Sequence, residues 1–241
     1  EIHHALSMHR GYMILGLPAL AEERLAAWDL IDGYMAELDV LSADWTDQQM
    51  IDDYDRFKVV MREFGAAQQQ IADVSHTPGD HPARTMFFVD AEPFGDEMVA
   101  NLQAIRDIDE NTNGQGDRKL LVRRIAAAEG HLLMSRVAVA AYLTSGAEED
   151  HAKIVACLTA GQAAVDRLLT MTDMFNAEQQ AHFDAYISAR ETFLDTAKEA
   201  VAIRGEPGHC VSEKICLNEV TPRSVEAVGL VGSVVGEQAA I

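Results

Sequence analysis

The sequence predicts an all-α protein whose long antiparallel helices form two related bundles, stacked or in tandem. Of its 241 residues 48% are hydrophobic but only 6% aromatic, and Ala, Leu, Val and Met abound. Alanine and unbranched side chains lose little conformational entropy in a helix. Apolar residues recur at three- and four-residue steps, as in helices that bury one face. Short stretches of the two halves also match at one spacing, which indicates an internal duplication.

The matching stretches begin with a Met-x-Arg motif. Met8–Arg10 precedes Ala21–Glu23, and Met134–Arg136 precedes Ala147–Glu149 at the same distance. The same number of residues therefore separates each stretch of the first half from its match in the second half, and it also separates Arg10 from Arg136. This register makes Arg10 and Arg136 equivalent residues.

In the first half, helices are expected over residues 1–16, with a break at Pro18, and over 20–41. Thr46 offers an N-cap, with Gln49 as capping-box partner, for a helix that continues to about Val74. Residues 76–81 contain Pro78-Gly79 and predict a loop. A third helix starts at Pro82 and should kink at Pro93.

The second half repeats this plan after a polar, glycine-containing linker over 109–117. Helices are expected over 120–144, 148–171 and 176–203, the last capped by Asn176, and from about 224 onwards. Pro207-Gly208 repeats Pro78-Gly79 at a slightly longer offset. The predicted modules are therefore 1–113 and 114–241, the second with a cysteine-containing loop over 205–221.

The net charge of −20 restricts the partners. A phosphate backbone would be repelled, so no nucleic-acid partner is expected. A solvated acidic surface explains the charge most simply, and attraction of cationic ligands is the alternative. The apolar stretch Val225–Val235 is too short to span a bilayer, but could lead towards one.

Cys210 and Cys216 lie close together in the polar stretch 205–222. They could form a loop disulfide, remain two thiols, or supply half of a metal site with His209. The disulfide is favoured, and it implies an oxidising compartment. Cys157 lies in an apolar stretch and is expected to be a small buried residue.

Catalytic motifs give no support for an enzyme. No Gly-x-Ser-x-Gly or glycine-rich phosphate loop is present. A carboxylate-bridged di-iron bundle requires Glu-x-x-His on two helices, and Glu148–His151, at the start of the helix expected over 148–171, would be one such pair, as chance alone allows. We therefore expect no metal, no cofactor and no catalysis.

Arg10 and Arg136 are the candidate ligand-binding residues, because each lies in a largely apolar helical segment. A buried arginine needs a partner. An intramolecular salt bridge or a side chain that extends to the surface would satisfy each one. The alternative is that both guanidinium groups receive an anion bidentately. Glu129 lies two helical turns before Arg136 and could contact either the arginine or the ligand.

These stretches resemble the extracytoplasmic sensor domains of bacterial chemoreceptors and sensor kinases, especially the helical bimodular and nitrate-sensing families. His9-Arg10-Gly11-Tyr12 is similar to the Glu-Arg-Gly-Leu/Ser motif of nitrate sensors. Ala128-Glu129 with Ser135-Arg136-Val137 is similar to their second motif. The sequence departs from these motifs at His9, Tyr12 and Ala128. The segment 80–105 is more similar to the third helix of a four-helix-bundle chemoreceptor domain.

The resemblance implies a periplasmic sensor domain of an inner-membrane chemoreceptor or histidine kinase. It would be a homodimer, flanked in the full-length protein by transmembrane helices. A small ligand, carboxylate- or nitrate-like, would bind between long helices at Arg10, Arg136, Glu129, Tyr12 and His9. The alternatives are a helical spacer that docks a partner and, less favoured, a metal-containing helical enzyme.

Overall fold

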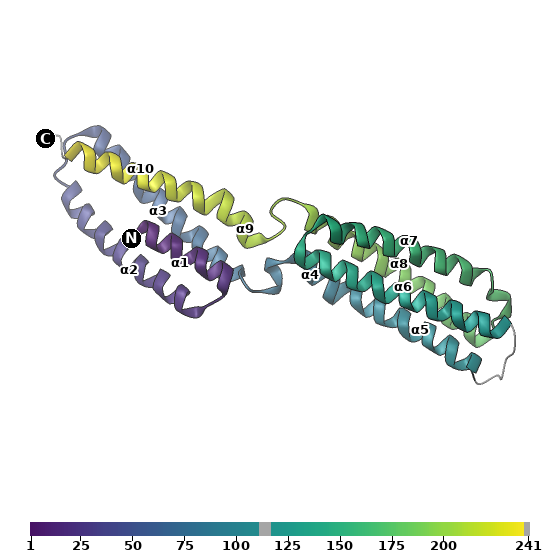
Figure 1. The fold of residues 1–241 in the computed structure, drawn as a ribbon. Helices are drawn as coiled ribbons and strands as arrows, with labels where there is room; N and C mark the ends of the chain where they lie inside the picture. The colour runs from purple at the N-terminus through teal and green to yellow at the C-terminus, as the bar shows by residue number, and fades with distance from the viewer. Residues whose placement is uncertain (111–116, 239–241) are drawn as a thin grey trace. The chain divides into compact units, whose positions relative to one another are not determined.

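The computed structural model describes residues 1–110 and 117–238, and in these residues all regular structure is helical, which confirms the all-α fold class (Figure 1). The long helices are α1 (Ile2–Leu15), α2 (Pro18–Ser42), α3 (Gln48–Val74), α5 (Glu92–Glu110), α6 (Asp117–Ser145), α7 (Glu148–Leu169), α8 (Ala177–Gly205) and α10 (Thr221–Gln238). The short ones are α4 (Pro82–Thr85) and α9 (Val211–Ile215). Most of the predicted linker, 111–116, lies outside the described residues.

The chain forms two compact units that are not sequential. Unit 1 comprises Glu1–Asp80 and Cys210–Ile241, and unit 2 comprises His81–His209. Within its described residues, unit 1 packs α1, α2, α3 and α10 around one hydrophobic core, and unit 2 packs α5, α6, α7 and α8 around another.

This division differs from the predicted modules 1–113 and 114–241. The last long helix of each half packs in the core of the other half. Phe87, Met98 and Leu102 from the first half are buried in the unit 2 core. Val220 and Ala227 from the second half are buried in the unit 1 core. An apolar helix face must be buried against another helix, but the sequence of the helix does not specify which partner it packs on.

The duplication is visible in how helices end. Gly16 ends α1 and Gly146 ends α6, each with φ of +65°, and their amides donate to the Tyr12 and Tyr142 carbonyl oxygens at 2.8 Å. Only glycine adopts this left-handed conformation without strain. Alignment of the two glycines makes Ala140, and not Arg136, the structural counterpart of Arg10. The Met-x-Arg register was wrong.

The aromatic core repeats with nearly the same spacing. In α3, Tyr54 stacks with Phe57 at 6.2 Å between ring centroids, and in α8, Phe183 stacks with Tyr186 at 5.9 Å. The buried Phe64 of α3 has its counterpart in the buried Phe193 of α8. These pairs share the offset between Pro78-Gly79 and Pro207-Gly208, so that offset is the register of α3 against α8.

The N-caps agree in part with the sequence prediction. Asn176 accepts from the Gln179 amide at 2.8 Å and completes a capping box, as predicted. The cap of α3 is Asp47 and not Thr46, because the Asp47 carboxylate accepts from the Met50 amide at 3.0 Å.

The predicted cysteine loop 205–221 is largely helical. It contains α9 and the π-helical turn η4 (Cys216–Val220), which matches the π-helical turn η2 (Met86–Ala91) of the first half. Asp80 holds this segment by accepting from the Ser212 amide at 2.8 Å and from its hydroxyl at 3.0 Å. Pro93 follows η2, so the predicted irregularity takes the form of a π-turn.

Candidate functional site

Arg136 is engaged within unit 2. Its Nε donates to Glu92 at 3.1 Å, and its Nη2 donates to the other oxygen of Glu92 and to Asp96, the latter at 2.7 Å. Gly95 makes room for this side chain, since a Cβ there would lie 3.1 Å from the Arg136 Nε. The pKa of Arg136 is raised, mainly by the hydrogen bond to Glu92. The guanidinium thus serves an intramolecular salt bridge, the first of the two expected roles.

Glu129 is not the partner of Arg136. Its carboxylate accepts hydrogen bonds from the side-chain Nε2 of Gln103 at 2.9 Å and from Nη1 of Arg106 at 3.1 Å. These bonds join α5 to α6. The two predicted site residues of unit 2 are therefore components of helix packing.

Arg10 lies in unit 1, where it is exposed and donates to the Thr221 hydroxyl at 3.3 Å. Tyr12 contributes its backbone carbonyl, which accepts from His76 Nε2 at 2.8 Å, and its ring meets the His76 ring edge-on. Arg10 and Arg136 thus belong to different units, Arg10 to unit 1 and Arg136 to unit 2.

His9, by contrast, is completely buried on the inner face of α1. Arg24 of α2 is 4% exposed and Gln68 of α3 is 0% exposed. We call His9, Arg24 and Gln68 the buried polar cluster. Both ring nitrogens of His9, the Nε of Arg24 and the Nε2 of Gln68 have no hydrogen-bond partner among the described residues.

Neighbouring side chains fix the orientation of this cluster. The Trp28 indole donates to the Gln68 Oε1 at 2.7 Å, which leaves the Gln68 amide NH₂ as the unpaired group. Arg24 Nη2 donates to the Gln69 Oε1 at 3.1 Å, and Gln69 in turn donates to Asp73 at 2.7 Å. Arg24 and Trp28 are one turn apart on α2, so both bridge to adjacent residues of α3.

The electrostatics of the cluster favour an anion. Burial lowers the pKa of His9 to about 4, and the charges of Arg24 and Arg10 add to this effect. Burial also lowers the pKa of Arg24, which the charge of Asp73 partly offsets. His9 is therefore neutral at pH 7, and Arg24 is a desolvated cation. An acceptor that reached Arg24 Nε and Gln68 Nε2 would relieve the cost of leaving buried donors unpaired.

Sequence reasoning identified His9 but missed Arg24 and Gln68. The signal was available for Arg24, because it precedes Ala27 and Ile31 by three and seven residues and so shares their buried face. Gln68 gave the same signal, because it follows Phe64 by four residues and precedes Ile71 by three and so shares their buried face.

The predicted disulfide is absent, because Cys210 and Cys216 are free thiols, like Cys157. Cys210 is the N-cap residue of α9 and its Sγ donates to Asp80 at 3.3 Å. Cys216 lies one helical turn and a half further on and packs in the unit 1 core. The helix separates the two side chains, which a loop would have allowed to meet.

Comparisons with known proteins find no matching family model and no similar curated sequence. None of the helices in the described part of the chain is both long and apolar enough to cross a membrane.

Proposed function

We propose that this chain is the ligand-binding sensor domain of a bacterial receptor, and that it binds a small carboxylate- or nitrate-like anion at the buried polar cluster. The supporting observation is the set of unpaired donors on Arg24 and Gln68, both at least nine-tenths buried. A guanidinium and a carboxamide are side chains that receive such anions through parallel hydrogen bonds.

Binding there would act on helices that run to both chain ends. His9 lies on α1, and Arg10 links α1 to the start of α10 through Thr221. The two helices run antiparallel in unit 1, so both lead to the same pole (Figure 1). An anion that prefers one arrangement of α1 against α2 and α3 would shift an existing equilibrium of these helices. This is how we propose that a signal reaches flanking transmembrane helices, with the domain on the periplasmic side.

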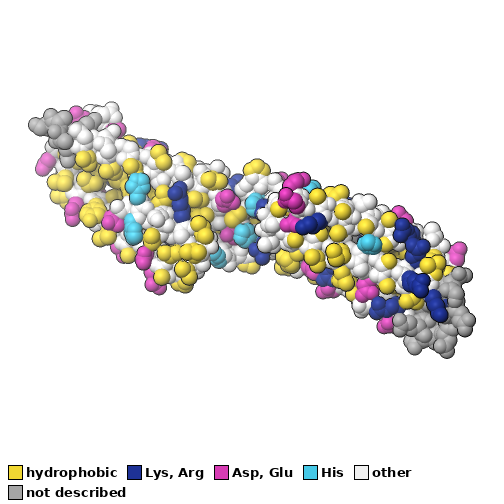
Figure 2. Space-filling model, in the orientation of Figure 1, with side chains coloured by type: hydrophobic (Ala, Val, Ile, Leu, Met, Phe, Trp, Pro, Cys, Tyr) yellow, Lys and Arg dark blue, Asp and Glu magenta, His cyan; other side chains and the backbone are white. Residues whose placement is uncertain are grey.

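A homodimer is part of this proposal. Leu30, Tyr34 and Leu41 share one face of α2 and are 51%, 53% and 57% exposed. Figure 2 shows apolar side chains over the α1 and α2 side of unit 1. A second copy of the chain would cover this stripe. Sedimentation of the wild type and of Tyr34→Glu tests this, with a concentration-dependent dimer expected only for the former.

The decisive experiment is a thermal-shift screen of the chain with sodium acetate, malate and nitrate, with sodium chloride at equal ionic strength and with small amines. We expect saturable stabilisation by at least one of the anions. The shift should disappear in Arg24→Gln, relative to the melting temperature of that variant, and should persist in Arg10→Gln, the matched exposed arginine.

Arg24→Lys, which keeps the charge but lacks the Nε donor, should retain a weakened response. If none of the compounds changed the melting temperature, the result would contradict the proposal and favour a helical spacer. Stabilisation that survives in Arg24→Gln would place the anion elsewhere.

A further inference from the structure

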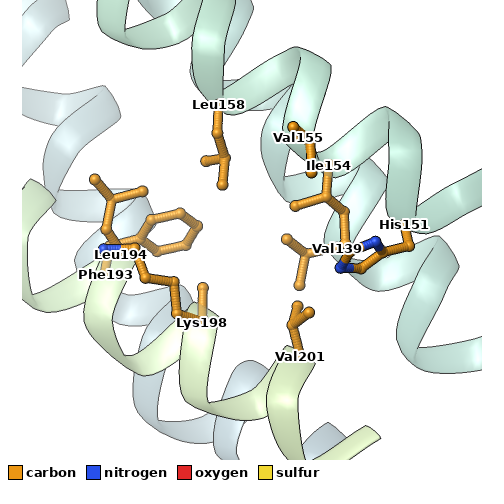
Figure 3. Close-up of a pocket in the computed structure, with 10 residues that line it drawn as sticks. Val139, His151, Ile154, Val155, Leu158, Phe193, Leu194, Lys198 and Val201 are labelled. Carbon is orange, nitrogen blue, oxygen red and sulfur yellow. The ribbon is translucent and has the colours of Figure 1, made fainter. Parts of the chain in front are cut away.

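Unit 2 contains an apolar cavity of about 160 Å³ between α6, α7 and α8. Figure 3 shows Leu158 and Ile154 of α7, Phe193 and Val201 of α8, and Val139 of α6 converging on it. Val139, Ile154 and Phe193 are each less than 5% exposed, so the inner wall is a buried hydrocarbon surface.

The cavity occupies the position in unit 2 that the buried polar cluster occupies in unit 1. Gly16 and Gly146 set the alignment of α1 and α2 with α6 and α7, and Phe64 and Phe193 set that of α3 with α8. By this register His9, Arg24, Trp28 and Gln68 correspond to Val139, Ile154, Leu158 and Ala197. Every polar member of the site in unit 1 is thus an aliphatic residue in unit 2.

The same correspondence shows which side chains of unit 1 are replaced around the cavity of unit 2. In unit 1 the Trp28 ring packs on Phe64 at 5.5 Å between centroids and closely covers Gly65. Leu158 takes the place of this tryptophan, and Ala197 takes the place of a glutamine. Phe193, the counterpart of Phe64, lines the cavity beside Leu158, and Leu194 and Val201 replace Gly65 and Ala72 on its α8 side.

Two basic residues at the cavity margin do not make it an anion site. Lys198 pairs with Asp195 at 3.4 Å and its side chain is 64% exposed. His151 lies 3.9 Å from Glu148 and is 40% exposed. Both side chains lie beside an acid and are open to solvent, so they supply no desolvated attraction comparable to Arg24.

We infer that unit 2 holds a second binding site, for a small neutral apolar molecule of about the size of benzene or toluene. An enclosed apolar cavity of roughly 150 Å³ lined by Leu, Ile and Phe admits benzene or xenon. The cavity of unit 2 has a similar volume and an apolar lining, and it opens to solvent beside Val155 and Lys198. The duplication has therefore produced two sites at one place in the bundle, one polar and one apolar. This inference does not depend on the anion proposed for unit 1.

The test is titration of the full chain with toluene, followed by calorimetry and by the shift of the melting temperature. We expect saturable binding to the wild type at one site. Leu158→Trp restores the tryptophan of unit 1 and should abolish toluene binding. Ala197→Ile fills the space from α8 and should do the same if Leu158→Trp does not fold.

His4→Gln, which changes an exposed histidine of unit 1 outside both sites, is the control, and it should bind toluene as the wild type does. Absence of toluene binding to the wild type, or unchanged binding in both filled variants, would overturn the inference. If benzoate bound at least tenfold more tightly than toluene, the assignment of a neutral ligand to this cavity would be wrong. An anion response that persists in Leu158→Trp would show that the two sites are separate.

Discussion

Arg136 of α6 donates hydrogen bonds from Nε and Nη2 to the two carboxylate oxygens of Glu92, the first residue of α5. The side chains are 17% and 23% exposed. This pair therefore stabilises the contact between two helices that follow each other in the chain and meet in unit 2.

Removal of the Glu92 carboxylate should weaken unit 2. We expect Glu92→Gln to lower the free energy of unfolding by about 1–3 kcal/mol, because a partly buried guanidinium loses its charged acceptor. Urea titration measures this loss. Asp195→Asn is the control, since it breaks a pair with Lys198 whose side chains are 81% and 64% exposed, and it should have a far smaller effect. Equal effects of both changes would show that Arg136 is not held as described.

Gly146, which follows the last residue of α6, and Gly130 within α6 should respond to substitution by alanine in opposite directions. Gly146→Ala forces a side chain into a conformation with φ of +65° and against Arg204, so a loss of about 1 kcal/mol or more is expected. Gly130 lies in the helix with no atom within 4 Å of an added Cβ. Gly130→Ala should therefore stabilise the protein by about 0.5–1 kcal/mol. Thermal unfolding of the two variants beside the wild type gives both signs.

His9 should make unit 1 sensitive to acid. Its pKa is about 4 in the folded protein against 6.5 in the unfolded chain. As the pH falls through this window, the unfolded chain takes up the proton first, so stability decreases from pH 6.5 towards 4. The contribution of this residue amounts to roughly 3 kcal/mol at the acid end.

The measurement is urea unfolding of unit 1 at several pH values. His9→Gln should show a smaller decrease between pH 6.5 and 4, whereas His4→Gln, which changes an exposed histidine, should follow the wild type. An unchanged pH dependence in His9→Gln would contradict the burial of a neutral His9.

The nested division into units predicts which fragments fold. Residues 81–209 contain all helices of the unit 2 core, so this fragment should unfold cooperatively and retain its helical circular dichroism. Residues 1–113 separate α5 from the helices that cover it, and should lack a cooperative transition. The reverse outcome would support sequential modules.

The sequence predicts the helices well and their partners poorly. Asn176 and the proline boundaries mark helix starts through local chemistry, which depends only on neighbouring residues. Phe87 shows why the units were not predicted. Its burial follows from helical periodicity, but the choice between the α3 and α8 cores depends on packing of the entire chain.

The candidate site shows the same difference. His9 was selected for its position in a motif, and its complete burial came from the fold. The hydrogen bond of Trp28 to Gln68 requires two helices to be placed side by side, which no local pattern of the sequence specifies. The repeat register failed because its matches included exposed residues such as Arg10, and the conserved geometry lies in Gly16, Tyr54 and their counterparts.

The insertion of unit 2 into unit 1 also imposes an order on folding. Arg223 of α10 meets Glu63 of α3 across 160 residues of chain, a contact that is slow to form in an open coil. Unit 2 is continuous in sequence, and α4 and α5 at its start pack on α8 at its end, so its folding brings its own two ends together. Once unit 2 has folded, the stretch of chain that must be closed to bring α10 to α3 is effectively short. Assembly of α10 onto α3 should therefore be the late step, with a rate that depends on the stability of unit 2.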